Sequence, residues 1–233
     1  MTDASAHGDL FGSAARYESL HAGLRDALDA VLPAAPQLQD DTEGGWTDWT
    51  TIGDLVKTGA LALRQAPAEL KTGGGEHPVL TAKDVRLGRG PSETAPTTPG
   101  AVPIEPGDVI TPLAPATPAV RVATQAHALL GHRLYLLRPD PGRIDAHFLA
   151  AYLRLAREPS RGQGSSFVHR ADVRRIRIPA LSITAQHTYG LSFRELLDFE
   201  AALRKTLRHG EEMIRTGFLG LTHGTLRPPS MCD

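Results

Sequence analysis

Arginine side chains are concentrated between Gly131 and Arg177, in a pattern suited to binding phosphate and the edges of nucleic-acid bases. This stretch holds ten arginines and four acidic residues, a net charge of +6, together with three histidines. It includes the polar loop Arg161–Ser166, which contains Gln163. Arginine pairs bidentately with guanine and glutamine with adenine, and phosphate neutralisation supplies much of the affinity for nucleic acid. The charge alone leaves two interpretations equally open, a phosphate-binding face or the solvated surface of a charge-balanced protein.

No set of side chains in the sequence matches a catalytic or metal-binding motif. There is no nucleophile elbow, Walker A sequence or EF-hand, and the ten histidines lack the His-x-x-x-His spacing of a zinc site. The single cysteine, Cys232, cannot form an intramolecular disulfide. The Asn/Asp-Pro-Pro-aromatic motif of adenine methyltransferases is missing, as is a glycine-rich cofactor loop after a strand. We therefore predict no catalytic residue, no metal and no cofactor.

Composition is that of an ordinary globular protein with an uneven charge distribution. The 233 residues are 41% hydrophobic and 22% charged, enough for one large domain or a domain with helical extensions. No apolar run approaches the ~20 residues of a membrane span, and the polar segment Met1–Asp9 lacks a signal-peptide pattern. We expect a cytoplasmic, nucleoid-associated protein. Residues 1–55 carry ten acidic and two basic side chains, a net charge of −8.

The elements that must position these side chains begin with an N-terminal helix. Residues 13–32 place apolar side chains at helical spacing, and Pro33 ends the predicted helix. The apolar residues are Tyr17, Leu20, Leu24, Leu28 and Val31. An acidic linker, residues 39–45, follows. Trp46 and Trp49 come next, and we favour their anchoring the linker to the core over their stacking on bases.

Short strands are predicted in the middle of the chain. Eight prolines between Gly88 and Pro118 forbid helix there and confine strands to short or edge segments. The predicted strands cover residues 78–82, 119–123, 134–137 and 173–178, and a turn at Gly107-Asp108 enters another strand. Residues 145–157 are predicted to be helical, with Phe148, Leu149, Tyr152, Leu153 and Ala156 facing inward.

A long helix is predicted from about Ser192 to Thr216, begun by a capping box between Ser192 and Glu195 and ended by Gly217. Side chains at a three–four repeat form a seam typical of a coiled coil or helical hairpin, and the repeat also takes in Glu200 and Gly210. The seam residues are Phe193, Leu196, Leu203, Leu207 and Ile214. The N-terminal helix has a similar repeat. The two helices are expected to pack together first, and a larger partner such as a methyltransferase subunit is expected second. The alternatives are pairing with a second copy and separate packing of the helices on one globular core.

Three segments in order along the chain resemble a known family. They are Val79-Leu80-Thr81-Ala82-Lys83-Asp84-Val85 followed by Gly88; Ile104-Glu105-Pro106-Gly107-Asp108-Val109-Ile110; and Gly164-Ser165-Ser166-Phe167-Val168 running on to Ile176-Arg177-Ile178-Pro179 and Gln186. Together they resemble the DNA target-recognition domain of type I restriction–modification specificity subunits. The C-terminal recognition region of related adenine-N6 DNA methyltransferases is similar. The sequence departs from the family after the Gly-Asp turn, at Thr111–Pro115, and in the approach to Gln186.

This resemblance implies an α+β fold. It consists of a mixed, mostly short-stranded β recognition domain with flanking helices, an N-terminal helix and a long C-terminal spacer helix. The expected domains are an N-terminal amphipathic helix and acidic linker at 1–45, a recognition domain at 46–186, and a spacer helix and tail at 187–233. The implied function is sequence-specific recognition of double-stranded DNA, without catalysis. A methyltransferase subunit, with or without a restriction subunit, is the implied partner, and a homodimer is possible.

Ten residues are expected to contact DNA. Lys83, Arg86 and Arg89 of the first segment are expected to bind mainly phosphate. The others belong to the Gly-Ser loop and the strand after it, namely Arg161, Gln163, Ser165, Ser166, His169, Arg170 and Arg174. The alternative function is a protein-interaction scaffold in a defence complex that reuses the same fold, and salt-dependent duplex binding distinguishes the two.

Overall fold

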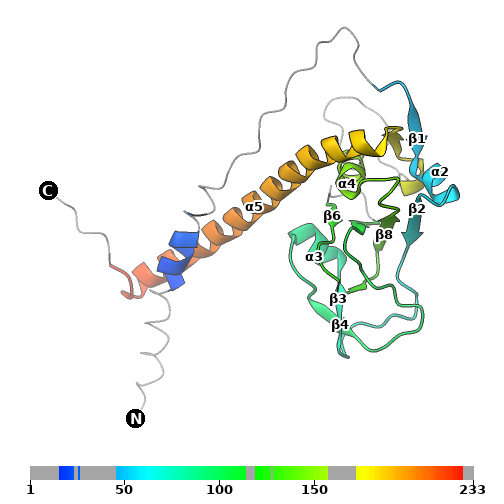
Figure 1. Cartoon of the computed structure of the whole chain (residues 1–233). Helices are drawn as coiled ribbons and strands as arrows, with labels where there is room; N and C mark the ends of the chain where they lie inside the picture. The colour runs from blue at the N-terminus through cyan, green and yellow to red at the C-terminus, as the bar shows by residue number, and fades with distance from the viewer. Residues whose placement is uncertain are drawn as a thin grey trace, which may run out of the picture. The chain divides into compact units, whose positions relative to one another are not determined.

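The computed structural model describes residues 16–23, 26, 46–113, 119–126, 128–156 and 172–227. The chain divides into two compact units, Ala34–Glu195 and the combination of Met1–Pro33 with Leu196–Asp233. The long helix α5 (Ile183–Thr222) contributes residues to both units (Figure 1). The fold is α+β with short strands, as the sequence predicts.

The Ala34–Glu195 unit contains three small sheets. The largest has the strand order β2-β8-β5-β6 and is antiparallel throughout; a second has the order β4-β3-β7, with β3 and β7 parallel; the third is the antiparallel pair β1-β9. The strands are β1 (Trp49–Thr51), β2 (Leu61–Arg64), β3 (His77–Leu80), β4 (Glu93–Ala95), β5 (Val109–Pro112), β6 (Arg121–Val122), β7 (Leu129–Leu130), β8 (Leu134–Pro139) and β9 (Arg177–Pro179).

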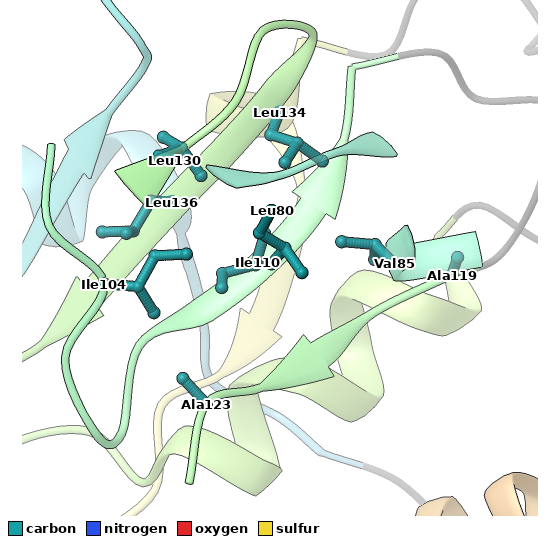
Figure 2. Close-up of a cluster of buried hydrophobic side chains, with 9 residues drawn as sticks. All are labelled: Leu80, Val85, Ile104, Ile110, Ala119, Ala123, Leu130, Leu134 and Leu136. Carbon is teal, nitrogen blue, oxygen red and sulfur yellow. The ribbon is translucent and has the colours of Figure 1, made fainter. Parts of the chain in front are cut away.

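Short helices cover these sheets. They are α2 (Ile52–Lys57), α3 (Ala82–Leu87), α4 (Ala146–Leu155) and the 3₁₀ turn η2 (Val173–Arg175). Strand β5 is buried along its whole length because helices α3 and α4 both contact it. Figure 2 shows the main cluster between β3, β5, β7, β8 and α3, with Leu80 and Ile110 at its centre.

The predicted helix at residues 145–157 is confirmed as α4. Asp145 caps it, with its Oδ1 accepting a hydrogen bond from the Phe148 backbone N–H at 2.8 Å. Phe148, Leu149 and Leu153 are buried as expected, whereas Ala156 is exposed. The predicted strand at 173–178 is wrong in its first half. That half is the 3₁₀ turn η2, held by Asp172, whose carboxylate accepts the Arg174 N–H at 3.1 Å.

Helix α5 is longer at both ends than the sequence pattern predicts. It starts after Ser182, whose side-chain oxygen accepts the Ala185 N–H at 3.3 Å, so the predicted capping box at Ser192 lies inside the helix. Gly217 also lies inside it, and the helix ends before Gly224, which has φ of 70°. Gly190 lies inside the helix, where a Cβ would come 2.2 Å from the Asp145 carboxylate, so glycine lets α5 pass close to the start of α4.

Gln186 joins the start of α5 to the start of α4. Its side chain is 3% exposed, and its Oε1 accepts the Asp145 N–H at 3.1 Å. Its Nε2 donates to the carbonyl oxygens of Arg143 at 3.2 Å and Leu181 at 2.9 Å. One amide therefore satisfies three backbone groups from two segments of the chain.

The second unit pairs the N-terminal helix with the C-terminal part of α5. Of the predicted helix at 13–32, residues 16–23 and 26 are described and helical. Arg16 forms an ion pair with Glu212, and the Tyr17 ring lies 3.2 Å from where a Cβ of Gly217 would be. Gly23 lies beside the His209 ring. The expected pairing of the two helices is thus present in the described residues.

Within the described residues, the N-terminal helix pairs with α5 but does not lie over the predicted seam. The side chains of Leu196, Leu203, Leu207 and Ile214 are each at least 50% exposed. Phe193 belongs to the other unit, where its ring packs against Phe148 and Tyr152. The pattern in the sequence therefore combined a half-buried residue of one unit with exposed apolar side chains of the other.

We expect Gln186→Leu to lower the free energy of unfolding by about 3 kcal/mol. The change leaves the Asp145 N–H and two carbonyl oxygens without their partner in a buried place, and each such loss costs roughly 1–3 kcal/mol. Chemical denaturation measures the effect. Thr184→Leu, an exposed change in the same turn of helix, is the control and should stay within about 0.5 kcal/mol of the parent. Equal stability of Gln186→Leu and the parent would show that the hydrogen bonds of the Gln186 amide do not stabilise the fold.

Candidate nucleic-acid interface

The candidate interface is built around the short helix α3. Thr81 accepts the Asp84 N–H at 3.2 Å, and Asp84 accepts the Thr81 N–H at 3.0 Å, which together form a capping box. Gly88 ends the helix with φ of 60°, a left-handed conformation that favours glycine. Val85 packs into the core, so the helix presents Lys83 and Arg86 to solvent.

Asp84 is the buried anchor of this region. Its carboxylate also accepts hydrogen bonds from Arg89 Nε at 2.6 Å, the Ser92 N–H at 3.2 Å and Ser92 Oγ at 2.9 Å. Burial acts to raise the pKa of Asp84, but the hydrogen bonds from Thr81, Arg89 and Ser92 outweigh burial and lower the pKa from 3.8 to about 2. The carboxylate is therefore ionised, and it fixes the loop that follows α3.

Arg89 therefore helps to hold this part of the fold. Its guanidinium is committed to Asp84, and its carbonyl oxygen accepts a hydrogen bond from Arg121 Nη1 at 2.7 Å. The predicted contact residues Lys83 and Arg86 lie on α3 itself and are exposed. Arg121, which the sequence analysis did not single out, is thus brought next to the loop after α3.

A pocket of about 370 Å³ lies beside this loop. Its lining includes Pro91 from the loop, Arg121 from β6, and the exposed Thr124 and Gln125 that follow β6. Its floor is apolar, formed by core residues such as Leu80 and Ile110. The pocket combines a guanidinium and a carboxamide, the two side-chain groups that read guanine and adenine edges. Arg121 lies within the predicted strand at 119–123 and Gln125 just after it, and both were missed because neither belongs to a motif.

The remaining predicted contacts are not brought together with α3 in the described residues. Arg161, Gln163, Ser165, Ser166, His169 and Arg170 lie outside the part of the chain that the structure describes. Arg174 is described and exposed, in η2. Residues 131–177 as a whole are thus described only at 131–156 and 172–177.

Several arginines of this basic stretch serve the fold. Arg138 makes a bidentate contact with the fully buried Asp108, at 2.8 Å for both nitrogens, and a third contact with Glu105 at 2.7 Å. Hydrogen bonding to Asp108 raises the pKa of the Arg138 guanidinium. Arg143 donates to the Thr58 carbonyl oxygen at 2.9 Å. The net charge of +6 therefore overstates the cationic groups available to a ligand.

Trp46 and Trp49 form a partly exposed aromatic cluster. Trp46 packs edge-on against Tyr189 with ring centroids 5.2 Å apart, and Trp49 Nε1 donates to the Trp46 carbonyl oxygen at 2.9 Å. The Arg177 guanidinium lies 5.1 Å from the centre of a Trp49 ring. These contacts support the interpretation that the tryptophans anchor the chain entering the unit.

Solved structures include chains with a similar fold. A structure from a study of complex assembly and conformational transition of the type I R-M system is similar at 18% identity and a TM-score of 0.50, over 92% of this chain and 54% of that chain. The HsdS subunit from Thermoanaerobacter tengcongensis is similar at 18% identity and a TM-score of 0.48, over 91% of this chain and 52% of that chain. The type I restriction–modification S subunit from M. genitalium is similar at 13% identity and a TM-score of 0.45, over 92% of this chain and 57% of that chain.

This similarity concerns the fold, because all identities lie below 25%, and only the first TM-score reaches 0.50. The chain spans about half the length of the structures it matches. No protein-family profile matches the sequence, and no curated protein matches it. Within the described residues there is no cluster of three metal-ligating side chains, and no helix is long and apolar enough to cross a membrane.

We expect Asp84→Asn to lower the free energy of unfolding at neutral pH by about 2 kcal/mol, the value of a pKa lowered by nearly two units. Because the pKa is lowered in the folded state, this stabilisation is complete above pH 3.8 and is lost as the pH falls through about 2. The difference between parent and variant should therefore shrink in that window. Denaturant unfolding measured across it checks both statements.

Asp54→Asn is a matched control for this experiment. Asp54 forms the same kind of cap on α2 with Thr51, but it is exposed and pairs only with Lys57. Asp54→Asn should therefore lower the free energy of unfolding much less than Asp84→Asn does. Equal losses for the two variants would mean that the cap, and not the buried ion pair with Arg89, supplies the stability.

Proposed function

We propose that the Ala34–Glu195 unit is a sequence-specific double-stranded DNA-binding module. The observation that carries the proposal is the exposed basic edge of α3 next to the pocket containing Arg121 and Gln125. Rigid elements hold both, because Asp84 fixes the loop between them through Arg89 and Ser92. The fold similarity to type I restriction–modification S subunits supports the same function.

The exposed cations and the pocket have different roles in this proposal. Lys83 and Arg86 bind phosphate and set the position of the duplex. Arg121 and Gln125 lie where a base edge can be read, together with Arg161, Gln163, Ser165, Ser166, His169, Arg170 and Arg174 from the second basic segment. Arg89 supports the site from behind, since its guanidinium is held by Asp84.

The module is proposed to work with a separate methyltransferase subunit, with or without a restriction subunit. It supplies the target sequence, while the partner supplies the cofactor and the chemistry. The non-catalytic role is supported by the sequence, which contains neither the adenine-methyltransferase motif nor a glycine-rich cofactor loop. Because the chain spans about half of the S subunits it resembles, it accounts for one recognition unit.

We expect Lys83→Ala/Arg86→Ala to weaken duplex binding by about 10–100-fold, since two phosphate contacts are lost. The slope of log K against log salt should fall by up to ~1.8, at ~0.9 per phosphate. Fluorescence anisotropy with a labelled duplex library, at several salt concentrations, measures both. Lys57→Ala/Lys205→Ala removes the same charge elsewhere and is the control.

The second basic segment is tested in the same assay with Arg161→Ala/Arg170→Ala. This pair should reduce binding and flatten the salt dependence. If the parent chain shows no salt-dependent duplex binding at low salt, the DNA-binding proposal fails and the protein-interaction scaffold becomes the better hypothesis. If only the control pair weakens binding, DNA binds elsewhere on the chain.

We expect the purified chain to transfer no methyl group to DNA from labelled S-adenosylmethionine. Adding a partner methyltransferase subunit should start methylation at a defined sequence, and Lys83→Ala/Arg86→Ala should reduce that methylation. Incorporation of label by the chain alone would contradict the non-catalytic role. Methylation of equal rate and sequence without the chain would contradict its role as the recognition component.

A further inference from the structure

A second pocket, of about 230 Å³, lies in the unit that combines Met1–Pro33 with Leu196–Asp233. Its lining comes from the N-terminal helix, the last turns of α5 and the turn that follows α5. Figure 1 shows the N-terminal helix beside this end of α5. The basic side chains of the lining are Arg16, Arg215 and His223, and no acidic residue lines the pocket in the part of the chain that the structure describes. The pocket is therefore a candidate site for an anion.

Helix α5 places Arg215 and His223 on one side of the pocket. Arg215, Leu219 and His223 are spaced by four residues, so each lies about 40° further around the helix axis than the one before. His223 follows the last residue of α5, but its N–H donates to the Leu219 carbonyl oxygen at 3.0 Å and so continues the helical turn. Thr216 and Gly220 lie beside this row, are buried and form the floor of the pocket.

The turn after α5 lines the pocket and pairs the carbonyl oxygens at the end of the helix. The Gly220 carbonyl oxygen accepts the N–H groups of Thr225 at 2.8 Å and Leu226 at 3.0 Å. A Cβ at Gly220 would lie 2.6 Å from the Leu226 side chain, so glycine lets the chain fold back here. The Leu221 carbonyl oxygen accepts the Gly224 N–H at 3.3 Å. Unpaired carbonyl oxygens at the C-terminal end of a helix repel anions, and these hydrogen bonds reduce that repulsion.

The basic side chains of the pocket retain donors for a ligand. Within the described residues, neither Arg215 nor His223 forms an ion pair or a side-chain hydrogen bond, and both are exposed. Arg16 forms an ion pair with Glu212, which does not belong to the lining. A guanidinium has five N–H donors, so one carboxylate leaves donors of Arg16 for a second oxyanion.

The Glu212 carboxylate reports the electrostatic character of this place. The hydrogen bond from Arg16 lowers the pKa of Glu212, and the nearby charge of Arg215 lowers it further, although burial acts to raise it. The surroundings of the pocket therefore stabilise a negative group. Glu212 is also the group that competes with an external anion for Arg16.

The size of the pocket and the directions of its donors favour phosphate. Pockets for drug-sized ligands have about 300–1,000 Å³, so about 230 Å³ suits a small anion or the end group of a larger molecule. Arg16 comes from one helix, and Arg215 and His223 come from the other. Donors from separate segments suit the tetrahedral oxygens of phosphate, whereas a planar carboxylate is satisfied by one guanidinium.

We propose that this pocket binds a phosphate group, with Arg16, Arg215 and His223 as donors. The phosphate belongs either to a free phosphate compound or to the backbone of DNA, which present the same oxygens to the site. Bound phosphate bridges the N-terminal helix and α5 and so stabilises their pairing. The pocket lies outside the Ala34–Glu195 unit, and the proposal does not rest on the function proposed for that unit.

The probe is inorganic phosphate, added to the ¹⁵N-labelled full chain at neutral pH and constant ionic strength and followed by NMR. We expect saturable shifts of the backbone amides of residues 223–226 with a Kd of about 1 mM. Sodium chloride at the same ionic strength should give no such shifts. Arg215→Gln should weaken phosphate binding by roughly tenfold or more, because a hydrogen bond between two charged groups is lost. Circular dichroism should show unchanged helix content, since Arg215 is exposed.

Two further variants separate binding from a general effect on the helix. Glu212→Gln removes the competing carboxylate and should tighten phosphate binding, opposite in direction to Arg215→Gln. Lys205→Gln removes the same charge as Arg215→Gln from an exposed position about 15 Å away along α5 and should leave binding unchanged. Equal weakening by Lys205→Gln and Arg215→Gln would show only a response to net charge and would overturn the proposed site.

Absence of saturable shifts up to about 20 mM phosphate, a concentration twenty times the expected Kd, overturns the inference. Shifts that Arg215→Gln leaves unchanged overturn it as well.

Duplex binding of the same variants distinguishes the two sources of phosphate. If Arg215→Gln weakens both duplex and phosphate binding, the site holds a backbone phosphate of DNA. If it weakens phosphate binding alone, the site holds a free phosphate compound, and the inference stands in both cases. Lys83→Ala/Arg86→Ala should keep phosphate binding while duplex binding falls. Phosphate binding without duplex binding therefore contradicts the proposed function alone, and duplex binding without phosphate binding contradicts this inference alone.

Discussion

Buried polar groups must find partners inside the fold, and this requirement determines how the short-stranded unit holds together. Its strands are two to six residues long, so main-chain pairing alone gives each one few hydrogen bonds. Three fully or almost fully buried polar side chains compensate, namely Asp84, Asp108 and Gln186. Asp108 ties the turn before β5 to Arg138 on β8, and Gln186 ties α5 to the segment before α4. Removing Arg138 or Gln186 would leave the buried groups that they bond without water or another hydrogen-bond partner, and this would lower the free energy of unfolding.

These three residues lie in the three sequence segments that resemble target-recognition domains, and this explains what the resemblance contains. Asp84 belongs to the first segment, Asp108 to the second and Gln186 to the end of the third. The segments therefore define the frame of the fold, while the side chains available to a ligand are their exposed neighbours, such as Lys83 and Arg86. Arg89 shows the difference, because its charge suggested a phosphate contact while its guanidinium completes the frame.

Periodicity in the sequence was sufficient to predict the three longer helices and several strands, but not the short helices α2 and α3, nor the limits and partners of the long ones. The helix starting near Asp145, the turn at Gly107-Asp108 and most of the inward face of α4 follow from local sequence and were predicted. The start of α5 was missed because its first turns are fixed by packing that the local sequence does not show: Gln186 bonds the Asp145 N–H, and Gly190 lies close to the Asp145 carboxylate, forty-odd residues earlier in the chain. The pocket containing Arg121 and Gln125 was missed for the same reason, since a strand after a proline-rich segment brings it to α3.

Helix α5 shows most clearly what a repeat can and cannot determine. The seven-residue spacing of its leucines predicts a seam, but a helix with a second, weaker repeat has two faces that can pair. In the described residues, the N-terminal helix occupies the face with small and polar side chains, Gly217 and Thr216 among them, where helices can approach closely. The larger side chains are left on the other face. Small side chains allow the close approach of two helices within the chain, and the leucines on the other face stay exposed in the described residues.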